Sequence, residues 1–153
     1  MQTATRAELE PFATGRKPTI YLAGAIHHVP PEFATTWRRA VTQALSDRFN
    51  ILDPTADKDL YDPDINTKVF TPEQIVTADL DMIFRADTIL AEMSRTDIPY
   101  HGTSMELAYA YNWKKQIIVW GGCQSYWVRY HATKIFDQME DALTYILYKD
   151  LKG

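Results

Sequence analysis

The sequence has little cysteine and no long apolar run, and each shortage excludes a class of protein. Among its 153 residues Cys123 is the only cysteine, so the chain can form no internal disulfide, and a reducing compartment is expected. No apolar run approaches the roughly 18 residues of a membrane span. The N-terminus carries no apolar segment of a secretory signal. These shortages predict a cytoplasmic protein that does not enter a membrane.

Positive charge is also scarce. The formal net charge is −4, and Lys114–Lys115 is the only pair of adjacent lysines, whereas a protein that binds duplex nucleic acid usually carries a basic stripe. The motifs G-x-x-x-x-G-K-[ST] and G-x-G-x-x-G are absent, so neither a P-loop nor a dinucleotide-binding fingerprint is present. We therefore expect no nucleic-acid partner and no cofactor.

A metal site is not expected either. His27 and His28 are adjacent, and adjacent histidines rarely bind one ion, while no carboxylate or third histidine has suitable spacing. Cys123 follows two glycines but has no evident base partner. A small buried thiol is therefore a better interpretation of this cysteine than a nucleophile.

The length and composition of the sequence, with 46% hydrophobic and 24% charged residues, are typical of one globular domain. Residues 1–17 are polar and predict a flexible arm. After them, apolar runs predict strands at 19–25, 49–54, 87–93 and 116–122, with a short fifth candidate at 133–136. Amphipathic stretches predict helices at 31–47, 71–86, 103–113 and 137–149.

This alternation predicts an α/β fold: a single-domain, doubly wound parallel sheet of about five strands, flavodoxin-like or Rossmann-like, with helices on both faces. Ligands of such sheets bind at the carboxyl ends of the strands. Four predicted loops meet at that edge, namely 25–30, 54–70, 94–102 and 121–130. A helix that begins directly after the third loop would carry its first side chains to the same place.

The segment "GTSMELAYAY", residues 102–111, places Glu106 near the start of that helix. Thr103 and Glu106 have the spacing of a capping box, which would make both residues structural. Alternatively, the helix dipole holds a carboxylate near a helix N-terminus in its ionised form, and such a carboxylate can act as a nucleophile. The local sequence agrees with both interpretations, and the position beside the predicted ligand site favours the second.

Two more polar residues stand where apolar side chains are expected. Asp79 lies four residues from both Ile75 and Ile83, within the apolar face of the helix 71–86, and Tyr21 lies in the middle of the strand 19–25. A carboxylate that faces a core needs a partner or a polar cavity, and a buried tyrosine hydroxyl needs a hydrogen-bond partner. A purely structural hydrogen bond remains an alternative for each residue.

The motifs "TIYLAGA", "ADLDMI" and "GTSMELAYA", in this order and spacing, resemble the nucleoside 2-deoxyribosyltransferase family and the related nucleotide N-glycosidases over residues 18 to 149. The resemblance implies that Glu106 attacks the anomeric carbon, that Tyr21 orients Glu106, and that Asp79 contacts the nucleobase and moves its proton. Residues 18–153 would form a catalytic domain that transfers a 2′-deoxyribosyl group between nucleobases through a covalent Glu106 intermediate. The substrate-binding residues expected on this basis are Gly24, Ala25, His27, Tyr100, Gly102, Thr103 and Met105.

Three departures from the family's pattern affect the expected substrate. Tyr100 replaces an aspartate or serine, His27 and His28 replace a serine and an arginine that hold a 5′-phosphate, and no asparagine follows the fourth strand. The first loop therefore favours 2′-deoxyribonucleosides as the substrates of the transfer reaction. The alternative is an enzyme that hydrolyses 2′-deoxynucleoside 5′-monophosphates. A non-catalytic nucleotide-binding module is a further alternative, although a binder needs no nucleophile.

Aromatic residues gather near the fourth loop, at Trp120, Tyr126, Trp127 and Tyr130. Such a cluster stacks a base or forms a subunit interface, and we favour the interface. The family is multimeric, so the resemblance also implies a homo-oligomer. The expected partners are therefore small-molecule nucleosides or nucleotides, free nucleobases, and further copies of the chain.

Overall fold

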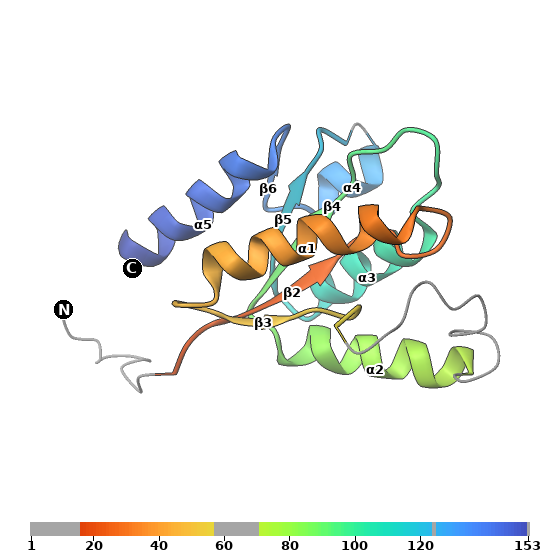
Figure 1. Ribbon diagram of the computed structural model, residues 1–153, viewed down its shortest axis with the longest axis horizontal. Helices are drawn as coiled ribbons and strands as arrows, with labels where there is room; N and C mark the ends of the chain where they lie inside the picture. Colours follow the sequence, from red (N-terminus) through yellow and green to blue (C-terminus); the bar gives the residue numbers. More distant parts are fainter. Residues whose placement is uncertain (1–15, 57–70, 124, 153) are drawn as a thin grey trace.

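A computed structural model describes residues 16–56, 71–123 and 125–152 of the chain. The predicted arm, up to residue 15, and the second predicted loop, from residue 57 to 70, lie outside the described residues. Within them, parallel strands form one sheet in the order β3-β2-β4-β5-β6 (Figure 1). The strands are β2 (Thr19–Ala23), β3 (Asn50–Leu52), β4 (Thr88–Glu92), β5 (Gln116–Trp120) and β6 (Lys134–Phe136). The predicted sheet is confirmed, including its short fifth strand.

Helices cover both faces of this sheet (Figure 1). They are α1 (Pro31–Leu45), α2 (Pro72–Arg85), α3 (His101–Asn112), α4 (Tyr126–His131) and α5 (Met139–Lys152). Side chains of α1 and α5 form the core of one face, and side chains of α2, α3 and α4 form the core of the other. None of the helices in the described part of the chain combines the length and the apolar character needed to cross a membrane.

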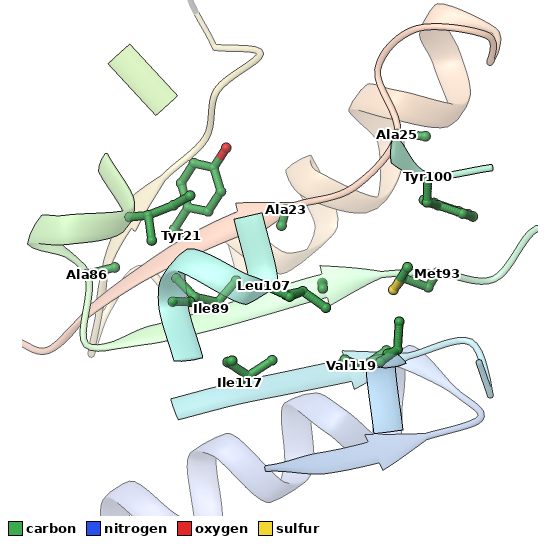
Figure 2. Packing of buried hydrophobic residues seen from close by; sticks show 14 residues of the cluster. Tyr21, Ala23, Ala25, Ala86, Ile89, Met93, Tyr100, Leu107, Ile117 and Val119 are labelled. Carbon is green, nitrogen blue, oxygen red and sulfur yellow. The ribbon is translucent and has the colours of Figure 1, made fainter. Parts of the chain in front are cut away.

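The interior strand β2 illustrates why the strands read as continuous apolar runs. Successive side chains of a strand point to opposite faces, and both faces of this sheet are covered. Ile20 and Leu22 join the core under α1, whereas Tyr21 and Ala23 join the opposite core, which Figure 2 shows. Full burial of a side chain such as Leu22 contributes about 1.5–3 kcal/mol relative to exposure.

The start of α2 agrees with the prediction. Thr71 caps the helix, since its hydroxyl accepts a hydrogen bond from the Gln74 backbone N–H at 3.1 Å. The Gln74 side chain in turn accepts from the Thr71 backbone N–H at 2.9 Å, which completes a capping box. Pro72 occupies the first position, where its missing N–H costs nothing.

The start of α3 differs from the prediction. The helix begins at His101 after Tyr100, whose backbone is left-handed with φ 52° and ψ 44°, and no side chain caps it. Thr103 therefore lies inside the first turn, and Glu106 lies in the second turn. The capping-box interpretation of Thr103 and Glu106 is wrong, because neither residue stands where it would cap the orphan amides.

Other differences concern helix bounds and one helix face. Residues 126–131 form α4, with the Ser125 hydroxyl accepting from the Val128 N–H at 3.4 Å, where a loop was predicted. The last helix begins at Met139, later than predicted. In α1, Arg38 is fully buried among apolar residues, a placement that the sequence analysis missed.

Candidate active site

A cavity of about 500 Å³ lies at the carboxyl ends of β2 and β4. Three segments line it: β2 with the loop that follows, the first half of α2, and the loop that leads into α3 together with the first two turns of that helix. Their lining residues are Tyr21, Gly24, Ala25, Ile26, His27, His28, Pro72, Ile75, Val76, Asp79, Ile98, Pro99, Tyr100, His101, Gly102, Thr103 and Glu106. The cavity therefore lies where a doubly wound sheet binds its ligands.

Glu106 reaches this cavity from the second turn of α3 and is held there by a strand residue. The Tyr21 hydroxyl donates a hydrogen bond to Glu106 Oε2 at 2.7 Å. Burial raises the pKa of Tyr21 well above its ordinary value, and the nearby negative charges of Glu106 and Asp79 raise it further. The hydroxyl consequently stays protonated and acts as a donor that fixes the orientation of the Glu106 carboxylate.

Asp79 approaches the same cavity from α2, the helix that packs against α3. Its side chain is half-buried, and its neighbours Ile75 and Val76 line the cavity with it. The predicted apolar face of α2 is thus divided. Ile83 enters the core, whereas Val76 is 52% exposed because it faces the cavity. Two carboxylates on two helices, Asp79 and Glu106, thus line one cavity together with apolar side chains.

Nearly all residues expected in the site lie together at the cavity. They are Tyr21, Gly24, Ala25, His27, Asp79, Tyr100, Gly102, Thr103 and Glu106. Met105 does not line the cavity, and its side chain is 66% exposed. Side chains of the fourth predicted loop are also absent from the lining, as far as that loop is described. Trp127 and its aromatic neighbours on α4 instead project into solvent.

Behind the cavity, Arg38 holds the end of β2, a role that the sequence analysis missed. Its guanidinium donates to the carbonyl oxygens of Ala34 at 2.7 Å, Gly24 at 3.1 Å and Leu22 at 3.4 Å. Asp53 lies 3.8 Å from Arg38 Nε. Burial lowers the pKa of Arg38, and the Asp53 charge opposes that shift. The spacing of Arg38 relative to Ala34, Val41 and Leu45 places it on the buried face of α1 and was the available signal.

The cavity also holds three imidazoles, of His27, His28 and His101, and only the first two had been noted from the sequence. Within the described ranges, no three His, Cys, Asp or Glu side chains are grouped so that they would hold a metal ion. The arrangement therefore offers an oriented carboxylate, a second carboxylate and the Tyr21 hydroxyl together with imidazole and apolar side chains. Such a set suits nucleophilic attack coupled to proton transfer.

Comparison with known protein families finds one family model that matches the chain. The family model described as "Nucleoside 2-deoxyribosyltransferase like" matches residues 17–122, which is more than half of the chain. The matched segment contains Tyr21, Asp79 and Glu106. A search of curated protein sequences gives no significant match.

Solved structures share the fold at low sequence identity. A conserved protein from Enterococcus faecalis V583 superimposes with a TM-score of 0.69 at 16% identity, covering 88% of this chain and 99% of the other. A 2-desoxiribosyltransferase from Leishmania mexicana gives 0.63 at 21% identity, covering 86% and 97%. The CMP N-glycosidase BcmB from Clostridium botulinum gives 0.56 at 17% identity, covering 85% and 98%.

Proposed function

Because the chain belongs to the nucleoside 2-deoxyribosyltransferase-like family, we propose that it cleaves the N-glycosidic bond of 2′-deoxyribonucleosides and transfers the deoxyribosyl group to another nucleobase. Members of this family act on nucleosides or nucleotides as small-molecule substrates. The observation that carries the proposal is the Glu106 carboxylate in the cavity, oriented by the Tyr21 hydroxyl at 2.7 Å and facing a space that Asp79 also lines.

In the first half of the proposed reaction, Glu106 attacks C1′ of the donor nucleoside. The bond from C1′ to the base nitrogen breaks through an oxocarbenium-like transition state, and its electron pair leaves with the base, as in retaining glycosidases. Asp79 enters this step as the carboxylic acid and supplies its proton to the departing base. Tyr21 holds Glu106 Oε2 by its hydrogen bond and so keeps the carboxylate oriented in the cavity.

In the second half, a nitrogen of the incoming base attacks C1′ of the glycosyl ester and expels the Glu106 carboxylate. The proton lost by that nitrogen passes to Asp79, which restores the starting state. Both halves pass through the same site, so the donor base must leave before the acceptor base enters. The apolar walls formed by Ile75 and Val76 offer a surface for each base in turn.

The test incubates the protein with deoxyinosine, thymidine, dCMP or dGMP, with and without free adenine, and separates the products by chromatography. Formation of deoxyadenosine from a nucleoside donor supports transfer. Glu106→Gln should lower turnover by at least about 10³-fold, and Glu140→Gln, in the exposed first turn of α5, is the matched control. A Glu106→Gln variant with near-normal turnover would contradict the mechanism.

A parallel pair of variants tests the proton relay. Asp79→Asn should lower turnover by about 10²-fold or more, the usual contribution of general acid–base catalysis. Asp81→Asn is its control, because Asp81 is exposed on the same helix and only pairs with Arg85 at 2.9 Å. Equal effects of the two substitutions would remove Asp79 from the mechanism.

Hydrolysis of a 2′-deoxynucleoside 5′-monophosphate is the second candidate, and the imidazoles of His27, His28 and His101 support it. Imidazole N–H groups at the cavity wall can donate hydrogen bonds to a phosphate. In the same assay this candidate predicts free base and deoxyribose 5-phosphate from dCMP or dGMP, with no deoxyadenosine when adenine is present. That outcome would replace transfer as the proposed reaction.

The proposal also includes assembly into a homo-oligomer. Side chains on the outer surface of α3 and α4 are exposed and largely aromatic; we call this group the α3–α4 surface, and it consists of Met105, Tyr109, Tyr111, Tyr126, Trp127 and Tyr130. Exposed apolar patches of this kind are typical of protein–protein interfaces. Because α3 also carries Glu106, such an interface would lie close to the cavity.

A further inference from the structure

Glu92, the last residue of β4, is a fully buried carboxylate that the proposed reaction does not use. It does not line the cavity. Its Oε2 accepts hydrogen bonds from the Ser94 backbone N–H at 2.9 Å, the Ser94 hydroxyl at 2.7 Å and the Tyr100 hydroxyl at 2.5 Å. A buried carboxylate is expensive unless it is bonded in this way. The three bonds tie the end of β4 to both ends of the loop that leads into α3.

Tyr100 connects Glu92 to the start of α3 through hydrogen bonds of its side chain and its backbone. Its hydroxyl donates to Glu92 and accepts from the Arg95 backbone N–H at 3.0 Å. Its backbone is left-handed, a conformation that costs a non-glycine residue about 1–2 kcal/mol. Its carbonyl accepts from the Ser104 N–H at 3.0 Å at the start of α3. Figure 2 shows Tyr100 beside Met93, just beyond the end of β4. The side-chain contacts therefore hold a strained backbone at the residue where α3 begins.

Two glycines bring neighbouring chain segments against this network. A Cβ on Gly121 would lie 2.5 Å from the Ser94 backbone N and Cα, so only glycine permits the loop after β5 to approach Ser94 this closely. A Cβ on Gly24 would lie 3.2 Å from Glu92 Oε1, and the Gly24 carbonyl is itself bound by Arg38. Glu92 is thus enclosed between the carboxyl ends of β2, β4 and β5, which leaves it little freedom to move.

We propose that Glu92 is a positioning residue for the nucleophile: through Tyr100 it sets where α3 begins, and thereby where Glu106 lies relative to Tyr21 and Asp79. The helix is rigid over the turn that separates Tyr100 from Glu106, so a shift at its start moves the carboxylate. A misplacement of about 1 Å far from the reacting atoms can lower a rate by about 10²-fold. The inference rests on the proposed function because the reaction is its kinetic readout.

The kinetic test uses the variants Glu92→Gln, Tyr100→Phe and Ser94→Ala, assayed well below their unfolding temperatures. The first two should lower kcat by about 10-fold or more with KM changed less than about 3-fold, and Ser94→Ala should have a smaller effect in the same direction. Glu92→Gln combined with Tyr100→Phe should be no slower than the slower single variant, because residues of one network are not additive. Tyr145→Phe, on α5 beyond the opposite face of the sheet, removes a hydroxyl without touching the network and is the control.

The structural arm measures hydrogen exchange of the Arg95 amide, which is bonded to the Tyr100 hydroxyl. Tyr100→Phe should accelerate its exchange by at least about 10-fold, and Glu92→Gln should also accelerate it, while Tyr145→Phe should not. Wild-type kcat in both Glu92→Gln and Tyr100→Phe, or unchanged Arg95 exchange in both, overturns the inference and leaves the proposed function intact. A wild-type chain that turns over none of the four donors contradicts the proposed function, whereas the exchange arm still decides whether Glu92 holds the start of α3.

Discussion

At the scale of single residues, the hydrogen bond from the Tyr21 hydroxyl orients Glu106, the proposed nucleophile. Tyr21→Phe keeps the ring in the core and removes the donor to Glu106. A hydrogen bond to a charged group contributes about 1.5–3 kcal/mol, so kcat should fall by about 10- to 100-fold. Steady-state kinetics with a nucleoside donor would measure the change.

The split between kcat and KM makes the Tyr21 prediction specific. Tyr21 lines the cavity and is hydrogen-bonded to Glu106, but only 1% of its surface is exposed, so KM should stay within about 3-fold of the wild-type value. A variant with unchanged kcat would mean that Glu106 needs no orienting donor. A variant that raises only KM would assign Tyr21 to substrate binding instead.

The three central site residues were recognisable in the sequence because each breaks a local pattern. Tyr21 interrupts an apolar strand, Asp79 interrupts an apolar helix face, and Glu106 lies in a mostly apolar helix. Glu92 was not recognised, because the Tyr100 hydroxyl that binds it comes from a loop position that only the folded chain brings near it. Arg38 was missed although its spacing on the buried face of α1 gave a local signal. A pattern within one element reveals a misplaced polar residue, whereas a network between elements leaves no local trace.

At the scale of elements, the two helices that carry the carboxylates begin in different ways. The start of α2 was predictable because Thr71 and Pro72 are local signals for a cap and a first turn. The start of α3 was not, because it follows a left-handed residue, Tyr100, whose side chain bonds to Glu92 and Arg95 outside the helix, and no local signal marks it. The Thr103–Glu106 spacing was misleading, since it matched a capping box one turn beyond the real helix start.

Thr71→Ala tests the local cap of α2. The variant removes the hydroxyl that accepts from the Gln74 N–H, so the free energy of unfolding should fall by about 1 kcal/mol. Thr77→Ala is the matched control: Thr77 is exposed in the middle of the same helix, where alanine is the better helix former, and stability should stay equal or rise slightly. Urea unfolding of both variants measures the difference, and equal destabilisation would show that the cap contributes nothing particular.

At the scale of the whole molecule, the alternation of apolar runs and amphipathic stretches was enough to predict the sheet, its parallel strands and the edge that holds the cavity. Which apolar side chains the fold leaves outside the core was harder to predict from the sequence. Ile75 belongs to the predicted apolar face of α2, and it lines the cavity. Met105 was expected in the site, and its side chain faces solvent. Amphipathic periodicity identifies the apolar face of a helix. It does not tell whether that face packs against the core, lines a cavity or contacts another protein.

The α3–α4 surface is the exposed aromatic surface at which we propose that copies of the chain assemble. Trp127 is 79% exposed and Tyr126 83%, on a helix whose only buried side chain is that of Val128. Tyr111 of α3 and Tyr130 of α4 contact each other with ring centres 5.3 Å apart and hydroxyl oxygens 3.3 Å apart, so the two helices present one continuous aromatic surface. Each large aromatic side chain would bury about 150–250 Å² against a second copy.

Trp127→Glu should therefore dissociate the assembly without unfolding the chain. The substitution places a charge in the middle of the aromatic surface, where burial against a partner would be costly, while the exposed position leaves the core unchanged. Sedimentation velocity should show an oligomer for the wild type and a monomer for the variant. Tyr148→Glu, exposed on α5 at the other face of the sheet, is the control and should sediment as the wild type does. A wild-type chain that sediments as a monomer while fully active would contradict the prediction, because the aromatic surface would then have no role in assembly.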